Sequence, residues 1–335
     1  MRLGVLDVGS NTVHLLIVDA HRGGHPTPMA SRKTALRLAE ALDAEGRLTR
    51  AGADALVAAV RTARSQASAA GRGDLLAFAT SALRDAPNSA AVLARVHAET
   101  GVALQVLPGE DEARYTFLAV RRWFGWSAGQ LLVLDIGGGS LELATGIDEL
   151  PSVAESLPLG AGRLTREWFS SDPPARREIE ALRQHVDAVL APVAAKLVEE
   201  GAPDRAVGTS KAFRSLARLT GAAPSSAGPR VRRVLTDAGL RQVGAFISRM
   251  SAGDLAELEG VSPSRAHQLV AGAVVAEAAM RALRITQLEM CPWALREGVI
   301  LRRLDWLDGA IRGDLSAHAA TSTGLPTPQE ARYTG

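Results

Sequence analysis

The sequence predicts an α/β protein of two related domains with a cleft between them, and two observations support this prediction. The segment VLDVG at residues 5–9 matches VLDIG at 133–137 position by position, and each copy continues through small polar residues into a second apolar strand. Strand-like and helix-like segments alternate around both copies, as they do in α/β folds. The offset of 128 residues is too long for a solenoid repeat. We therefore predict one domain at 1–127 and a second at 128–308.

In the first predicted domain, short apolar runs indicate strands, and apolar residues at helical spacing between capping signals indicate helices. Thr49 is the predicted N-cap of one helix, and Asn88 or Ser89 caps the next, which ends before Gly101. The predicted strands cover residues 3–8, 14–20, 75–80 and 103–107, and the predicted helices cover residues 49–70, 88–100 and 109–124.

The second predicted domain opens with a strand, a glycine turn and a strand within residues 130–147. Helical patterns dominate its later part. The other predicted elements are helices at 174–200, 262–283 and 293–307 and strands at 205–207 and 285–290. Residues 309–335 contain Gly, Ser, Thr and Pro with little apolar content, so we predict a mostly disordered tail.

The composition excludes several classes of protein. Hydrophobic residues make up 47% of the 335 residues and charged residues 22%, which is typical of a globular chain with a large core. Cys291 is the only cysteine, which excludes an intrachain disulfide and a four-cysteine zinc site. Asp7 interrupts the first apolar run, unlike a signal peptide, and no uncharged apolar run approaches the ~18 residues of a membrane span. We expect a cytoplasmic protein with no membrane partner.

The positive charge is unevenly distributed, although the formal net charge is only +2. Residues 205–250 contain nine basic residues and one acidic residue, and such an excess can concentrate a polyanion near a site. No interleaved aromatic residues support base stacking there, so we expect a polyanionic substrate rather than a nucleic acid. Only three of the 38 basic residues are lysines, namely Lys33, Lys196 and Lys211. A GC-rich genome produces the same bias toward arginine without any functional meaning.

The two matching turns are candidate phosphate-binding loops. Their sequences are Asp-Val-Gly-Ser-Asn from Asp7 and Asp-Ile-Gly-Gly-Gly-Ser from Asp135. Glycines permit positive φ and let backbone N–H groups close around an anion, and an aspartate at a strand end can supply a hard oxygen ligand for Mg²⁺. A single Asp-x-Gly is typical of an ordinary tight turn. Its repetition in the same strand context predicts two loops that hold one phosphate chain from both sides.

Two further segments follow predicted strands. GEDEAR at 109–114 places three carboxylates at the start of a helix, where a carboxylate can orient and deprotonate a water for attack on phosphorus. Acids that complement the helix dipole give the same pattern, so both interpretations stay open. Arg84 follows the strand at 75–80, at the edge where open α/β sheets bind ligands, and can brace a phosphate. His14 is expected to be a core residue, and Cys291 an inert buried thiol.

Seven segments occur in the order found in the Ppx/GppA family of exopolyphosphatases and guanosine pentaphosphate phosphohydrolases, which the chain resembles. They are LDVGSNTVHLLI (6–17), ATSALRDAPN (79–88), GEDEARYTF (109–117), LDIGGGSLEL (134–143), LPLGAGRL (157–164), GTSKAFR (208–214) and ALREG (294–298). The resemblance covers about residues 1–307 and implies two ribonuclease-H-like domains of the actin-like ATPase superfamily. It also implies that the last helix packs back on the first domain. The short chain resembles the two-domain actinobacterial form, and family analogy alone suggests a homodimer.

The resemblance implies a role for each motif residue. Glu112 matches the family's catalytic glutamate, which activates the attacking water. Asp135 matches a magnesium-linked aspartate, Glu142 matches a glutamate that holds metal-bound water, and Asp7 of the first hairpin is the third candidate metal ligand. Mg²⁺ is the expected cofactor, with Mn²⁺ as an alternative. The candidate phosphate-binding residues are Gly9, Ser10, Asn11, Thr12, Arg84, Gly137, Gly138, Gly139, Ser140, Gly208, Ser210 and Lys211.

Departures from the family pattern bear on the substrate. Asp111 replaces the first glutamate of the acidic loop, Leu141 replaces a small or polar residue, and Lys211 and Ala212 replace Gly-Thr. A lysine in that loop can clamp a further phosphate or block a nucleoside. We predict an exopolyphosphatase that releases terminal orthophosphate from polyphosphate, with short chains favoured. The alternatives are a guanosine pentaphosphate phosphohydrolase of the stringent response and, from another class, a phosphate-ligand sensor without turnover.

Overall fold

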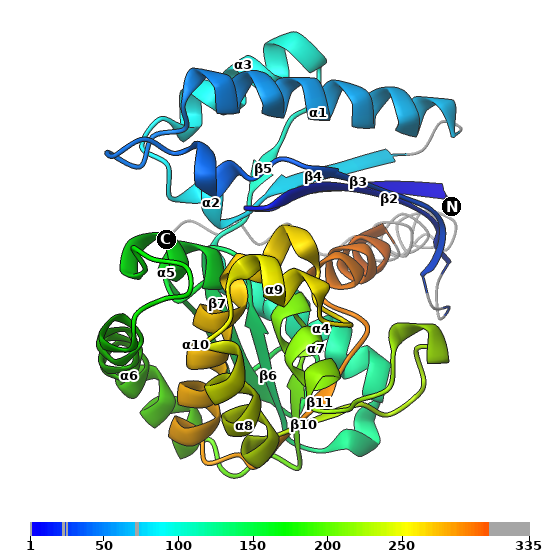
Figure 1. The fold of residues 1–335 in the computed structure, drawn as a ribbon. Coiled ribbons are helices and arrows are strands. Elements are labelled where there is room, and N and C mark those ends of the chain that lie inside the picture. The colour runs from blue at the N-terminus through cyan, green and yellow to red at the C-terminus, as the bar shows by residue number, and fades with distance from the viewer. Residues whose placement is uncertain (1, 22–23, 25, 71–73, 308–335) are drawn as a thin grey trace, which may run out of the picture.

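The computed structural model describes residues 2–21, 24, 26–70 and 74–307, which form two sheets with helices on their faces (Figure 1). The predicted disordered tail at 309–335 lies outside the described residues. Among the described residues, no helix is long and apolar enough to cross a membrane.

The first sheet has five strands in the order β3-β2-β1-β4-β5. Its first three strands are antiparallel neighbours, and β4 and β5 run parallel to β1. The bounds are β1 Arg2–Val8, β2 Thr12–Asp19, β3 Thr27–Ala35, β4 Asp74–Ala79 and β5 Gln105–Val106. Helices α1 (Arg50–Ala69) and α3 (Ser89–Thr100) cover one face, where their apolar residues pack on those of β1 and β2 (Figure 1).

The ends of these two helices follow the capping signals in the sequence. The Thr49 side chain accepts a hydrogen bond from the Gly52 amide, as predicted for an N-cap. Gly101, at φ 67°, adopts the left-handed conformation that ends α3. The Asn88 side chain makes no cap bond and instead exchanges two hydrogen bonds with the backbone of Leu48.

The second sheet has six strands in the order β10-β11-β9-β6-β7-β8. Its bounds are β6 Leu131–Ile136, β7 Leu141–Gly146, β8 Val153–Leu157, β9 Arg205–Gly208, β10 Val234–Thr236 and β11 Gln287–Met290. The series β8-β7-β6-β9-β11 has the same order and directions as β3-β2-β1-β4-β5, with β10 added at the edge. The predicted duplication of an α/β domain is therefore confirmed.

The remaining helices lie mostly around the second sheet. They are α2 Ser81–Arg84, α4 Gly109–Phe124, α5 Ala161–Trp168, α6 Arg176–Glu199, α7 Lys211–Leu219, α8 Asp237–Ile247, α9 Ala252–Glu257 and α10 Leu269–Ala282, with 3-10 turns at η1 Leu38–Ala41, η2 Trp126–Ala128, η3 Ser225–Ala227 and η4 Pro263–Gln268. Residues 295–307 form a further helix.

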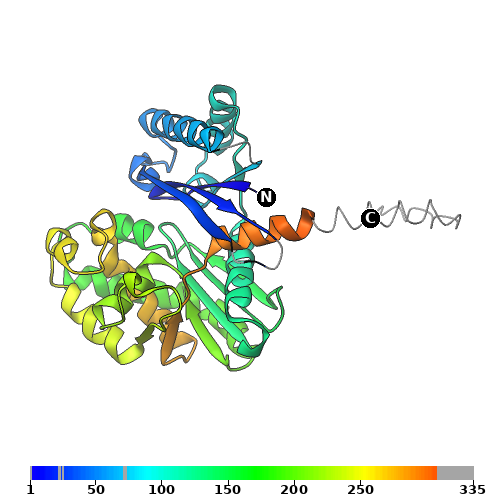
Figure 2. The same cartoon turned by 90° about the vertical axis from the view of Figure 1, so that its right-hand side faces the viewer.

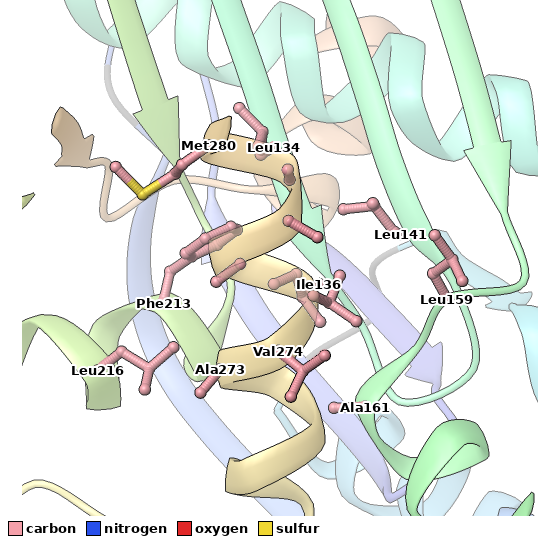
Figure 3. Packing of buried hydrophobic residues seen from close by; sticks show 14 of the residues in the cluster. Leu134, Ile136, Leu141, Leu159, Ala161, Phe213, Leu216, Ala273, Val274 and Met280 are labelled. Atoms are coloured by element: carbon pink, nitrogen blue, oxygen red, sulfur yellow. The ribbon is translucent and has the colours of Figure 1, made fainter. Parts of the chain in front are cut away.

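Alternation along β6 divides the second domain into three layers. Leu134 and Ile136 point to the face covered by α6, α7 and α10, where Figure 3 shows them against Phe213 and Val274. Val133 points to the opposite face, where it packs with Phe117 of α4. Successive side chains of a strand point to opposite faces, so an almost continuously apolar strand serves two helix layers.

Two helices cross between the halves of the chain. Helix α4 lies before the predicted boundary at 127/128, yet it packs on β6, β7 and β8 of the second sheet. The helix at 295–307 lies in the last part of the chain and packs on the first sheet, where Ile300 is buried with Leu3 and Val5 (Figure 2). The packing of the last helix on the first domain is thus confirmed, and the boundary itself stays a prediction.

Three strands are absent from the sequence-based expectations. These strands, β3, β8 and β10, lie at sheet edges, where side chains face solvent on at least one side. They lack long apolar runs, with sequences TPMASRKTA, VAESL and VLT. The helix predicted at 262–283 begins with the 3-10 turn η4 and continues as α10.

Candidate active site

The ends of β1 and β6 meet at a cavity of about 430 Å³ that both domains line. Most predicted site residues line this cavity, namely Asp7, Gly9, Ser10, Asn11, Thr12, Glu112, Asp135, Gly137, Gly138, Ser140, Glu142, Ser210 and Lys211. Arg84, Gly139 and Gly208 are not among its lining residues. The fold thus brings predicted site residues from four separate segments of the chain to one place.

The two glycine turns have the same backbone closure. The Gly9 amide donates to the Thr12 carbonyl at 3.0 Å, and the Gly137 amide donates to the Ser140 carbonyl at 2.8 Å. The glycines of these turns do not use the positive φ that glycine permits, since the described residues with positive φ lie elsewhere. Position 139 requires glycine because Ser81 lies too close for a side chain. A Cβ at this position would lie 2.4 Å from Oγ of Ser81.

The turns also bind the domains to each other. The Asn11 and Gln268 side-chain amides exchange two hydrogen bonds, with Gln268 Nε2 donating to Asn11 Oδ1 at 2.9 Å. A Cβ at Gly138 would lie 2.8 Å from Nδ2 of Asn11 and 2.9 Å from Cβ of Ser10. The second turn therefore rests directly on the first, and the cavity lies beside this contact.

Only one acid of the GEDEAR segment enters the cavity. Glu112, in the first turn of α4, is 6% exposed, and its carboxylate pairs with the guanidinium of Arg84. Glu110 and Asp111 face solvent more and pair with Arg114 at 2.9 Å each. Both interpretations of the segment are therefore seen, in different residues: Glu112 fits a catalytic carboxylate, and its neighbours are helix-surface acids.

Burial raises the pKa of all four cavity carboxyl groups. For Glu112 the nearby Glu142 adds to this effect, and Arg84 opposes it. For Glu142 the negative charge of Asp135 adds to burial. Burial likewise raises the pKa of Asp7 and Asp135, against the positive charge of Arg265 and, for Asp135, against a hydrogen bond from Thr209. The cavity therefore contains four buried carboxyl groups, of which Glu112 alone forms an ion pair with a described residue.

These carboxylates fit a divalent cation bound with help from the substrate. Among the described residues, no group of three or more His, Cys, Asp or Glu side chains is placed to hold a metal on its own. Mg²⁺ usually takes one or two carboxylates and completes its octahedron with water and phosphate oxygens. Asp7, Asp135 and Glu142 form no ion pair with any described residue, and a cation among them would relieve the cost of their burial.

Arg84 is placed differently from the expectation. Its guanidinium is held by Glu112 and by Asp85, and it lines a neighbouring hollow of about 280 Å³ with Gly109, Ser156 and others. The predicted contact of Arg84 with a substrate phosphate stays a prediction, while the structure shows it orienting the carboxylate of Glu112.

Several cavity residues were not singled out from the sequence as site residues. Lys33, Thr209, Arg214, Arg265 and Arg296 line the cavity, and so does the buried His14. His14 bonds through Nε2 to Oγ of Ser31 at 2.7 Å, so it lies in the sheet core and at the cavity wall. A positional signal existed for four of them, because Thr209 and Arg214 lie inside the GTSKAFR motif, Arg296 inside ALREG and His14 inside LDVGSNTVHLLI.

The basic segment at 205–250 reaches the cavity through Lys211 and Arg214. Other members are neutralised elsewhere, since Arg205 and Arg232 pair with Glu289, Arg218 with Glu259 and Arg241 with Asp237. Net charge along the sequence therefore overstated the positive field at the site. Cys291 is fully buried, as predicted, and burial raises the pKa of its thiol.

Two copies of one sheet, each with an aspartate and a glycine turn at a shared cavity, define a two-domain α/β protein built to hold phosphate. Residues 17–306 match the model of the Ppx/GppA phosphatase family, and the chain belongs to this family. It is 67% identical over 305 residues to exopolyphosphatase 1 of Mycobacterium tuberculosis, covering 91% of this chain and 89% of that protein.

Two further comparisons agree with this membership. Exopolyphosphatase 1 of Mycobacterium leprae is 65% identical over 305 residues, covering 91% of this chain and 90% of that protein. The crystal structure of an exopolyphosphatase from Cytophaga hutchinsonii superposes with a TM-score of 0.82 at 23% identity, over 91% of this chain and 98% of that one. The second comparison shows the shared fold.

Proposed function

We propose that the chain is an exopolyphosphatase that releases terminal orthophosphate from inorganic polyphosphate. The observation that carries the proposal is one cavity that combines both glycine turns, the buried Glu112 and the cations of both domains. The relatives at 65–67% identity are named exopolyphosphatases, which supports the same substrate for this chain. The single buried cysteine is consistent with a cytoplasmic site of action.

The binding step follows from the two turns. Backbone N–H groups and the hydroxyls of Ser10 and Ser140 can surround the terminal phosphate from both domains. Asp135 and Glu142, with Asp7 opposite, are the residues that would hold Mg²⁺ or Mn²⁺. The bound metal would neutralise charge on the phosphate oxygens.

The chemical step rests on Glu112. Its carboxylate would accept a proton from the water that attacks the terminal phosphorus in line with the bond to the rest of the chain. Burial raises the pKa of Glu112 to about 9 and so increases the proton affinity of its carboxylate, while the charge of Arg84 opposes this shift. Arg84 fixes the orientation of this carboxylate, and the displaced oxygen leaves with the shortened polyphosphate.

The test measures phosphate release from tripolyphosphate and from long polyphosphate, with and without Mg²⁺. We expect metal-dependent release that Glu112→Gln reduces by about 10²–10⁴-fold. Glu110→Gln is the matched control, because Glu110 lies two residues away on the same helix and pairs with Arg114 at the surface. Unchanged release by Glu112→Gln would remove Glu112 as the base. A higher initial rate with guanosine pentaphosphate than with polyphosphate would overturn the substrate.

A further inference from the structure

Two lysines, one from each sheet domain, line the same cavity. Lys33 lies on β3 of the first sheet, Lys211 is the first residue of α7, and both line the cavity from exposed positions. Neither side chain forms an ion pair or hydrogen bond with another described residue. The third lysine of the chain, Lys196, pairs with Glu155 at 2.9 Å on the surface. The two cavity lysines therefore differ from the third in lacking a partner.

Other positive charges surround Lys211. Partial burial lowers the pKa of its ammonium group first, and the charges of Lys33, Arg214 and Arg265 lower it further. Burial lowers the pKa of Arg265 as well, and the negative charges of Asp135 and Asp7 oppose that effect. Besides its carboxylates, the cavity is therefore lined by several cations that form no ion pair with a described residue. Like charges held together without a counter-ion favour an anion between them.

The choice of lysine has a physical meaning in this chain. Of its 38 basic residues only three are lysines, and two of these three are at the cavity. Arginine binds phosphate through a planar fork that fixes orientation, whereas the lysine ammonium is a point charge on a flexible stem. A polyphosphate must advance by one unit after each cleavage. Point charges hold such a chain while leaving it free to slide.

We propose that Lys33 and Lys211 together bind the part of the polyphosphate chain behind the scissile bond, as a subsite that neither domain forms alone. This inference rests on the proposed function, because it assigns a second subsite to the same cavity. The terminal phosphate occupies the glycine turns, and the following phosphates lie between the two ammonium groups. The pair would make a polyanionic continuation of the substrate favourable and an uncharged one unfavourable.

A labelling experiment tests the subsite without turnover. The full-length Glu112→Gln protein is acetylated with Mg²⁺ present, with and without saturating tripolyphosphate at equal ionic strength, and each lysine is followed by mass spectrometry. We expect tripolyphosphate to slow acetylation of both Lys33 and Lys211 by about fivefold or more. Lys196 is the internal control and should change less than twofold. Equal labelling of Lys33 and Lys211 with and without tripolyphosphate would overturn the subsite.

Kinetics of the wild-type background provide the second test. We expect Lys33→Gln and Lys211→Gln each to raise KM for tripolyphosphate by about tenfold with kcat changed less than threefold, and Lys211→Arg to restore most of the affinity. The Lys196→Gln variant should behave as wild type. An unchanged KM in both variants would refute the inference while leaving the exopolyphosphatase proposal intact. Protection of the lysines in a protein whose wild type releases no phosphate would refute the proposed function alone.

Discussion

The two sheets present the same cross-strand positions with different side chains. Asp7 of β1 lies opposite His14 of β2, and Asp135 of β6 lies opposite Glu142 of β7. Asp135 follows Asp7 by 128 residues, and Glu142 follows His14 by the same 128 residues. His14 is therefore the structural counterpart of Glu142. Duplication has kept the aspartate at the strand end and has exchanged its neighbour. One copy has two carboxylates at this place, and the other has one.

The next strand extends the difference. His14 lies opposite Lys33 of β3, whereas Glu142 lies opposite Ser156 of β8, whose hydroxyl donates to Glu142 Oε1 at 3.0 Å. The first row of paired residues is thus Asp7, His14 and Lys33, and the second row is Asp135, Glu142 and Ser156. The second row contains two carboxylates and a hydrogen bond, whereas the first row ends in a lysine without an ion-pair partner among the described residues. The comparison shows that both domains contribute a glycine turn, and that the row beside the aspartate contains a glutamate in the second sheet and a histidine and a lysine in the first.

The largest effect is expected from making the second row resemble the first. Glu142→His replaces a hard oxygen ligand with an imidazole, which suits Mg²⁺ poorly, so phosphate release at fixed Mg²⁺ should fall by about 10²–10³-fold. Initial rates over a Mg²⁺ titration measure this change. The control is Glu155→His on β8, where the glutamate pairs with Lys196 outside the cavity. A variant with more than a tenth of the wild-type rate would show that Glu142 holds no metal.

The helices that cover the sheets allow a second comparison. Ile300 is completely buried between the last helix and the first sheet, so Ile300→Ala should lower the free energy of unfolding by about 2–5 kcal/mol. Urea denaturation followed by circular dichroism measures it. Leu150→Ala, at a residue that is 71% exposed, should change it by less than about 0.5 kcal/mol. Equal stability of the two variants would show that the last helix contributes little to the first domain.

A smaller effect is expected where Gln268 of η4 meets the first glycine turn. Gln268→Ala leaves the amide of Asn11 without its partner, and kcat/KM for tripolyphosphate should fall about tenfold because the first turn loses its brace. The double variant with Asn11→Ala should lose less than the sum of the two single losses in free energy. Strict additivity would contradict a direct coupling between Asn11 and Gln268.

The smallest effect concerns stability and pH. The pKa of Glu142 is raised above its ordinary 4.5 by burial and by Asp135, so the folded, metal-free protein loses stability as the pH rises through and above that value. Glu142→Gln removes the ionisation, so we expect a higher free energy of unfolding at pH 8, by about 1 kcal/mol or more, and little change at pH 4. Thermal unfolding in EDTA at both pH values measures the difference, and a lower stability of the variant at pH 8 would contradict it.

Much of the fold follows from local sequence signals. The repeated VLDVG pattern predicts both hairpins, and the start and end of α4 at Gly109 and Phe124 agree with the expectation. Edge strand β3 was missed because its polar, exposed residues lack any apolar period, and Lys33 was missed with it. Arg265 belongs to a helical pattern and shows no motif, so only tertiary packing identifies it as a cavity residue.

The site residues likewise divide into those predicted from local sequence motifs and those that only tertiary packing identifies. Glu112 and the turn residues lie in contiguous motifs, and the sequence places them correctly at one cavity. The pairing of Arg84 with Glu112 depends on how α2 meets α4, which no local pattern encodes. The net charge of residues 205–250 overestimated the positive charge at the cavity, because the carboxylate partners Glu259 and Glu289 lie outside that segment.

The exchange of helices between the two halves has a consequence for the order in which the protein matures. A ribosome delivers the chain from the N-terminus, and domains generally begin to fold as they emerge. The face of the first sheet that contains Leu3 and Val5 stays uncovered until Ile300 has been synthesised. The nascent N-terminal half therefore exposes apolar surface during almost the whole of translation. The first sheet, which is synthesised first, is therefore covered on this face only when the last helix has been synthesised.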